Sequence, residues 1–270
     1  MSSLLLRPTV VGAFVRRDFV GTRSYRLAFL LDVSYGVLDL VLYYFISKTF
    51  SGFTSEELGG APSYFAFAAA GVILGLVITA SSSGVAFRLR EEQVTGTLEA
   101  MSTEPVAPFE MCAGLVGFPF AFAVVRSGLY LAVAAIFLDL DLSNTSWSGF
   151  VLVLVVSGVA LAPLGMLAGA AVLVFKRGTL VSTTLVYLLT ILAGMVFPVS
   201  VLPDWLEPLA DLVPLTYAFD GVRDAMFVGS GWGGDVLALA LWAVVLWPVG
   251  LAAFAGGLAY AKRAGSLAQY

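Results

Sequence analysis

Long apolar stretches alternate with short polar segments along the whole chain. A helix needs about 20 consecutive apolar residues to cross the ~30 Å hydrocarbon core of a bilayer. Six stretches are long enough, and they fall near residues 27–50, 62–87, 113–138, 149–175, 179–202 and 236–261. The pattern therefore predicts an all-α polytopic membrane protein with six transmembrane helices.

The N-terminal segment, residues 1–24, does not form a seventh span. Its apolar residues recur at helical spacing among arginines, at Val11, Phe14, Val15 and Phe19. A helix with one apolar face and basic residues beside it lies in the plane of the membrane interface. We expect this segment to be an amphipathic interface helix.

Composition agrees with a membrane location and removes several classes of chemistry. Of the 270 residues, 60% are hydrophobic and 12% are charged, about half the charged fraction of a typical soluble domain. The chain has no histidine and a single cysteine, Cys112. These counts exclude imidazole-dependent catalysis, an intramolecular disulfide and a zinc site, and we expect no catalytic residue and no metal ligand. The net charge of −4 argues against a nucleic-acid partner.

Positively charged residues orient the spans. With the N-terminus in the cytoplasm, 11 of the 14 Lys and Arg residues fall on the cytoplasmic side, as the positive-inside rule requires. Six crossings return the C-terminus to the same side, so both termini are predicted to be cytoplasmic. Two connections are long, residues 88–112 inside and 198–235 outside, and no linker divides the chain. We therefore treat residues 1–270 as one domain.

The cytoplasmic connection contains a short polar helix, predicted over residues 91–104. Val94, Leu98 and Met101 fall on one narrow apolar stripe, and Pro105 stops the helix. Gly96 indicates either a break or a close approach by another backbone. A narrow stripe suits docking into a groove on a partner protein, and a solvated connector is the alternative.

The outer connection has room for two short helices within residues 203–228. Pro214 separates them, and neither is long enough to cross the bilayer. Both are apolar enough to dip into the membrane from outside, because buried backbone is tolerated there against protein or a cavity. The two interpretations are an extracellular gate and a lid that seals the outer mouth.

Ionisable residues also occur inside the spans. Asp39 lies 12 residues into the first span from Leu27, and Arg126 lies 11 residues into the third span from Leu115. An unpaired charge at that depth costs about 2.5–3.5 kcal/mol or more. We predict that Asp39 and Arg126 form a buried ion pair, with a proton-coupling site or a polar patch for a substrate headgroup as the alternative. Asp32, nearer the cytoplasmic end, is expected to reach interfacial water.

Two motifs carry a resemblance to a known family. Glu91-x4-Gly96-Thr97-Leu98-Glu99-x5-Pro105 resembles a stretch of the type-2 ATP-binding-cassette (ABC) export permeases. The second motif resembles the segment before that family's sixth span. It comprises Gly194-Met195-Val196-Phe197-Pro198, Leu202-Pro203-x-Trp205-Leu206, Pro214-Leu215-Thr216-Tyr217 and Asp220-Gly221-Val222-Arg223. The order of elements along the whole chain is also similar.

The resemblance implies a role for each part. Residues 91–104 would be the coupling helix, seated in a cleft of an ATPase, with contact positions at Glu91, Glu92, Gly96, Thr97, Leu98 and Glu99. The outer segment would be an extracellular gate that includes Phe197, Pro198, Pro203, Trp205, Pro214 and Tyr217. Two ATPase chains and a second permease, an identical copy or a sister chain, would complete a transporter in the bacterial inner (plasma) membrane.

The energy source would lie outside this chain. The sequence has no G-x-x-x-x-G-K-[ST] phosphate loop, so ATP and Mg²⁺ are expected on the ATPase and no cofactor is expected here. The expected function is outward movement of an amphiphilic drug-like, lipid or lipid-linked glycan substrate.

Two other classes of protein compete with this interpretation. A proton-coupled secondary transporter would use Asp39 and Arg126, although no inverted repeat is evident. An intramembrane enzyme would rely on Ser81–Ser83 or Cys112, and no activating base stands at a readable spacing from them.

Overall fold

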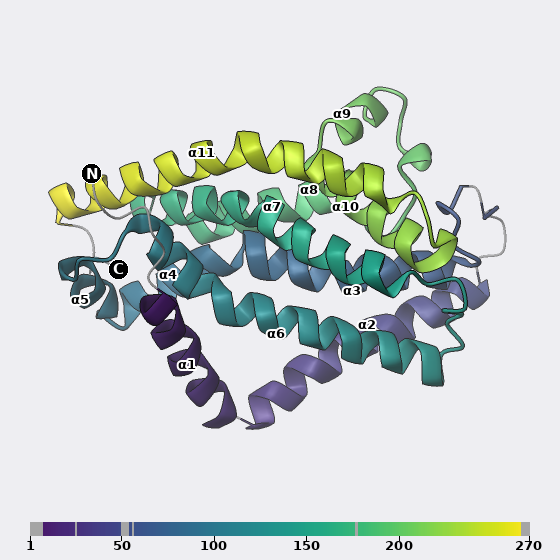
Figure 1. Cartoon of the computed structure of the whole chain (residues 1–270), viewed down its shortest axis with the longest axis horizontal. Helices are drawn as coiled ribbons and strands as arrows, with labels where there is room; N and C mark the ends of the chain where they lie inside the picture. The colour runs from purple at the N-terminus through teal and green to yellow at the C-terminus, as the bar shows by residue number, and fades with distance from the viewer. Residues whose placement is uncertain (1–7, 25, 50–53, 56, 176–177, 266–270) are drawn as a thin grey trace.

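The computed structural model describes residues 8–24, 26–49, 54–55, 57–175 and 178–265, and within these ranges the regular structure is entirely helical. The long helices run along the long axis of the molecule, and the connections gather at its two ends (Figure 1). Five helices of the described residues are long and apolar enough to cross a membrane: α2 (Arg26–Thr49), α3 (Tyr64–Ser82), α6 (Pro108–Phe137), α7 (Trp147–Val174) and α11 (Trp232–Ala264). The predicted all-α polytopic membrane fold is confirmed.

The predicted fifth span is shorter than its hydropathy suggested. α8 (Gly178–Leu192) ends ten residues before the expected boundary at residue 202. Gly194 has a φ of +78°, and the N–H groups of Gly194 and Met195 donate to the carbonyls of Ile191 and Thr190. This is the Schellman arrangement that ends a helix at a left-handed glycine. The apolar residues beyond it form a turn and the short 3-10 helix η1 (Val199–Val201), so apolar composition extends past the helix.

The other predicted span boundaries lie closer to the helix ends of the structure. The second span ends at Ser82, and α4 (Gly84–Val94) follows directly after Ser83. The helices α6, α7 and α11 begin a few residues before the predicted starts.

α3 forms the centre of the bundle. It is apolar on every side and rich in alanine and glycine, a composition that lets neighbouring helices approach closely. It packs against α2, α6 and α7, while α7 and α11 pack together along most of their length. A Cβ at Gly71 would collide with the carbonyl oxygen of Met195, and one at Gly165 would collide with that of Ser81. Glycine is therefore required at both contacts.

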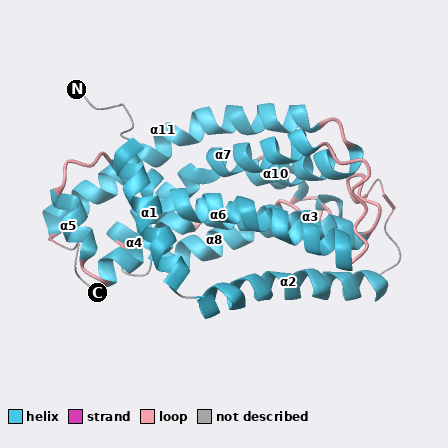
Figure 2. Cartoon of the chain, turned by 60° about the horizontal axis from the view of Figure 1, so that its bottom comes forward, coloured by secondary structure: helices cyan, strands magenta, loops and turns pink. Residues whose placement is uncertain are grey.

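α1 (Pro8–Ser24) lies across the first turns of α6, as expected for a helix outside the bundle. Phe14 and Val15 cover Gly114 and Gly117, and the ring of Phe19 meets that of Phe118 edge-on at 6.3 Å. α2 follows the C-terminal end of α1 and stands along one side of the bundle (Figure 2). Gly36, in the first half of α2, packs against Tyr130, in the last third of α6, so α2 begins part-way along α6 and not beside its first turn.

The two ends of the bundle differ in structure. At one end, α5 (Thr97–Thr103) meets the last turn of α11, where Lys262 Nζ donates to the Ser102 carbonyl at 2.8 Å. The other end carries α9 (Glu207–Asp211), α10 (Pro214–Arg223) and the π-helix η2 (Asp224–Val228). α10 packs against α3, α7 and α11, whereas α9 stands on the outer surface (Figure 1). The predicted pair of short outer helices is thus present on either side of Pro214.

Candidate functional site

The cytoplasmic segment predicted as one helix over residues 91–104 is two helices. α4 ends at Val94, and α5 begins at Thr97 after a turn in which Gly96 has a φ of +76°. No atom lies within 4 Å of the Cβ that would be added at Gly96. The glycine therefore marks a break in the helix and not a close approach of another backbone.

This break divides the predicted contact positions into exposed and buried ones. Glu91, Thr97 and Glu99 are exposed, and Gly96 is partly so. Leu98 is fully buried in a core cluster with Leu89, Phe254 and other apolar residues. Glu92 is 6% exposed. The assignment of Leu98 and Glu92 to a contact surface is wrong, because Leu98 packs into the core after the bend and Glu92 is buried against Arg17 of α1.

Glu92 instead joins three helices. Its carboxylate accepts from Arg17 of α1, with Nη1 and Oε1 2.7 Å apart, and from the hydroxyl of Thr97 at the start of α5. The neighbouring Asp18 is buried between Arg17 at 3.0 Å and Arg88 at 3.7 Å. Burial lowers the pKa of Arg17, but the carboxylates of Glu92 and Asp18 outweigh burial, so the net pKa is raised. These charge-assisted contacts tie α1 to α4 and α5.

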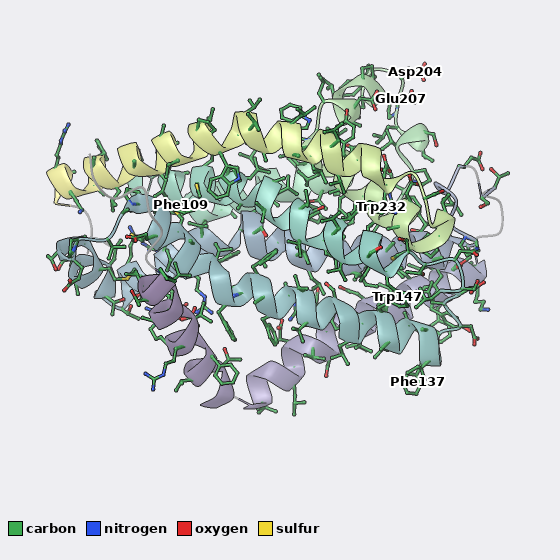
Figure 3. The ribbon with its side chains drawn as sticks, viewed as in Figure 1. Phe109, Phe137, Trp147, Asp204, Glu207 and Trp232 are labelled. Atoms are coloured by element: carbon green, nitrogen blue, oxygen red, sulfur yellow. The ribbon has the colours of Figure 1, made fainter. Side chains whose placement is uncertain are left out.

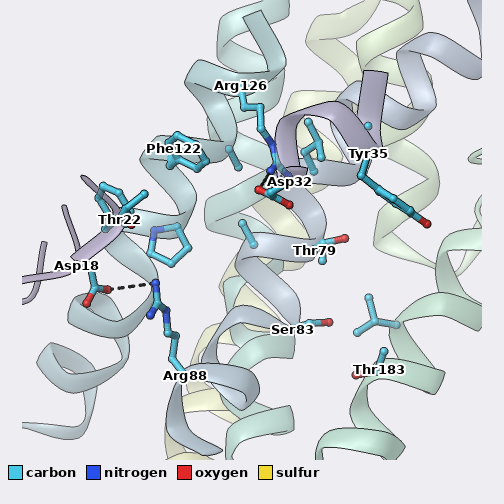
Figure 4. A pocket seen from close by; sticks show the side chains of 18 of the residues that line it. Asp18, Thr22, Asp32, Tyr35, Thr79, Ser83, Arg88, Phe122, Arg126 and Thr183 are labelled. Carbon is cyan, nitrogen blue, oxygen red and sulfur yellow. Dashed lines mark hydrogen bonds and ion pairs between the residues drawn. The ribbon is translucent and has the colours of Figure 1, made fainter. Parts of the chain in front are cut away.

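A cavity of about 1180 Å³ opens beside this network. It lies between α1, α2, α3, α6 and α8, and it reaches from the α4–α5 turn to Met195 near the outer end. In Figure 4, Asp18 and Arg88 mark its α4 end, while Thr183 of α8 faces Thr79 and Ser83 across it. A cavity of this length, lined by both polar and apolar side chains, suits an amphiphilic molecule.

The predicted ion pair between Asp39 and Arg126 is wrong, since Arg126 pairs with Asp32 (Figure 4). The guanidinium carbon also lies 5.7 Å from the ring centroid of Tyr130 and 5.8 Å from that of Phe122. Counting residues from the start of each span misplaced the partner because α2 begins part-way along α6. That offset brings Asp32, about two turns earlier than Asp39, level with Arg126.

Asp39 lines the same cavity on α2. Among the residues that the structure describes, it has no ion-pair or hydrogen-bond partner. Its side chain is half-buried beside Tyr35 and Tyr43, one turn away on either side, which also line the cavity.

The outer end holds a contact that the sequence did not reveal. Arg223 of α10 is 2% exposed, and its Nη2 donates to the carbonyls of Gly194 and Met195 at 2.6 and 3.1 Å. Its guanidinium carbon lies 3.6 Å from the ring centroid of Phe67, a cation–π geometry. Burial lowers the pKa of Arg223 to about 10, with Asp220 opposing the shift, so the group stays charged at neutral pH. Arg223 thus fixes the turn that ends α8, and only its place in the second motif pointed to it.

The predicted gate residues do not form one cluster. Phe197 and Pro198 belong to the turn after α8 and are partly or fully buried, whereas Trp205 is 71% exposed and Pro203 is also exposed. Pro214 opens α10, and the Tyr217 hydroxyl donates to the Asp211 carbonyl at 3.0 Å. Of these parts of the outer region, the turn after α8 is the one whose carbonyls accept hydrogen bonds from Arg223 in the described structure, and the role of the six residues as a gate stays a prediction.

Comparison with known proteins decides the family. The family model for the ABC-2 type transporter matches residues 10–227, which include α4, α5, the residues that line the cavity and Arg223. The chain belongs to the ABC-2 type transporter family. It is therefore a membrane subunit of a transporter, and the family implies association with an ABC ATPase.

Curated relatives agree with this assignment. The inner membrane transport permease YadH of Escherichia coli (strain K12) is 28% identical over 187 residues, covering 69% of this chain and 72% of the relative. Nodulation protein J of Neorhizobium galegae is 28% identical over 223 residues, which cover 78% of this chain and 79% of the relative. Nodulation protein J of Rhizobium leguminosarum bv. viciae is 26% identical over 215 residues, which cover 78% of this chain and 80% of the relative.

Proposed function

We propose that this ABC-2 permease moves an amphiphilic substrate (drug-like, lipid or lipid-linked glycan) outward, driven by ATP that a separate ATPase hydrolyses. The contact that carries the proposal is Glu92, which joins the α4–α5 segment to Arg17 of α1. α1 leads directly into α2, and α2 lines the cavity. A displacement of α5 is thereby passed to the wall of the cavity, because short charged contacts move as a unit with the helices that carry them.

The proposed partners are two ATPase chains, which hold ATP and Mg²⁺, and a second permease that is either a copy of this chain or a sister chain. The second permease would pack against α2 and α8, two of the helices beside the cavity, which expose apolar side chains. On α2 these are Leu31, Leu38 and Leu42, and on α8 they are Leu185 and Leu188. Such faces can pack against a second subunit, which would close the open side of the cavity.

The proposed location is the bacterial inner membrane, with both termini in the cytoplasm. The distribution of Lys and Arg supports this orientation, and so does the name of the relative from Escherichia coli, an inner membrane transport permease. In this orientation α5 faces the cytoplasm and α9 faces outward.

Co-purification in mild detergent tests the proposal. The tagged wild-type chain should bring down an ATPase, identified by mass spectrometry through its phosphate loop. Glu99→Arg should reduce the yield by about fivefold (~1 kcal/mol) because Glu99 is exposed on α5. The matched control is Glu207→Arg, since Glu207 projects from α9 at the other end of the molecule (Figure 3). Absence of an ATPase with the wild type in every detergent, or equal losses in both variants, would contradict the proposal.

A further inference from the structure

The charges that line the cavity are not balanced. Three arginines line it, Arg17, Arg88 and Arg126, against five carboxylates, Asp18, Asp32, Asp39, Glu91 and Glu92. Each of these arginines forms ion pairs with carboxylates of the same lining. Arg17 pairs with Glu92 and Asp18. Arg88 pairs with Asp18 and Glu91, and Arg126 pairs with Asp32. Negative charge is therefore in excess, and an anionic headgroup would find no free cation among the described residues of this lining.

Asp39 is the carboxylate of this lining that the described arginines leave unmatched. It lies on α2 within the membrane-spanning part of the chain, where an ionised group without a partner is expensive. A negative charge at this depth gains from a counter-ion that enters the cavity, because the hydrocarbon and protein around it screen charge less than bulk water does.

Other side chains that line this cavity suit a cation. Tyr35, Tyr43 and Tyr187 line the same cavity from α2 and α8, and aromatic faces attract ammonium groups within about 6 Å. Thr79 and Thr190 add hydroxyl groups that can accept hydrogen bonds. The combination of one carboxylate with several tyrosines is the chemistry by which proteins recognise amines and quaternary ammonium ions.

We propose that Asp39 is the binding residue for the positively charged headgroup of the transported amphiphile, an amine or a quaternary ammonium. This inference rests on the proposed function and narrows its substrate class. A neutral or anionic amphiphile would leave Asp39 without a counter-ion, whereas the single positive charge of a cationic one would pair with Asp39 and lower the excess of negative charge in the lining. The apolar part of the substrate then lies against Val72, Leu76 and Val186, which line the cavity nearby.

The test measures binding of a permanently charged probe to the purified permease, with its co-purified ATPase, in lipid nanodiscs. Radiolabelled tetraphenylphosphonium is the cation, and tetraphenylborate is the anion of nearly the same shape. Equilibrium dialysis against empty nanodiscs removes the contribution of partition into lipid. The variants are Asp39→Asn, which removes the charge, Asp39→Glu, which keeps it, and Asp204→Asn as the matched control. Asp204 projects from the outer surface beside Glu207 (Figure 3).

We expect saturable binding of the cation to the wild type and to the variants Asp204→Asn and Asp39→Glu. The affinity of Asp39→Asn for the cation should be about tenfold lower than that of the wild type. Equal affinity of Asp39→Asn and wild type, or equal saturable binding of the anion, would overturn the proposal. Loss of a second permease copy from Asp39→Asn, with unchanged cation binding, would make Asp39 a subunit contact and also overturn it. Co-purification of the ATPase is recorded on the same samples. A sample that retains the ATPase but lacks selective binding contradicts this inference alone, and a sample without the ATPase contradicts the proposed function.

Discussion

Substitution of Asp32 by asparagine should destabilise the folded chain, because it leaves the charge of Arg126 uncompensated within the bundle. Removal of one partner from a fully buried ion pair costs about 3–5 kcal/mol. The Arg126 side chain is 15% exposed, but that of Asp32 is 58% exposed to the cavity. Water in the cavity therefore screens part of the charge, and we expect a loss of about 1–2 kcal/mol in the free energy of unfolding.

The assay is unfolding of the purified permease by sodium dodecyl sulfate in mixed micelles, followed by tryptophan fluorescence. The double variant Asp32→Asn/Arg126→Gln removes both charges. Its loss should be smaller than the sum of the single losses by about 1 kcal/mol, the coupling energy of the pair. Asp39→Asn is the internal comparison, and its unfolding free energy should be no lower than that of the wild type, because the substitution removes an unpaired charge within the span. A coupling energy near zero for Asp32, or a larger one between Asp39 and Arg126, would refute the pairing and restore the partner that the sequence predicted.

Two further predictions concern the α4–α5 segment and the orientation of the chain in the membrane. Glu92→Gln should lower the unfolding free energy of the permease without its ATPase by about 1 kcal/mol, since Glu92 holds Arg17 and Thr97 inside the chain. The exposed Glu91→Gln should change this unfolding free energy by less than about 0.5 kcal/mol, and equal effects of the two substitutions would mean that the contacts of Glu92 do not stabilise the fold. A membrane-impermeant maleimide should label Trp205→Cys in intact cells but Glu99→Cys only after permeabilisation. The buried native Cys112 should give no background, and the reverse pattern would invert the topology.

Hydropathy was sufficient to locate the membrane helices because each of them must be apolar over its whole crossing length. This requirement is global and tolerates a few irregular positions. The end of α8 is different, since a single glycine with positive φ sets it and the residues that follow are as apolar as the helix itself. The second motif includes Gly194, but the hydropathy pattern does not distinguish this glycine from those inside other spans.

The partners of charged residues could not be obtained by counting along the chain. The prediction for Arg126 assumed that every span begins at the same level. The packing of Phe14 and Val15 on Gly114 and Gly117 shifts the start of α2 instead. Likewise, the inward orientation of Glu92 depends on the bend at Gly96 and on Arg17, which lies 75 residues earlier in the sequence. Both features are set by contacts between distant segments, and no local pattern records them.

The same contacts explain how one short segment can affect both ends of the molecule. Leu98 anchors α5 in the cluster that contains Phe254 of α11, and Lys262 of α11 bonds to Ser102 of α5. α11 is one continuous helix whose far end packs against α10, and α10 carries Arg223. A force on α5 therefore has two rigid routes, one through Glu92 and α1 to the cavity wall, the other along α11 to the turn that ends α8. Because packed helices transmit displacement with little compression, we expect the cavity and the outer turn to respond together when α5 moves.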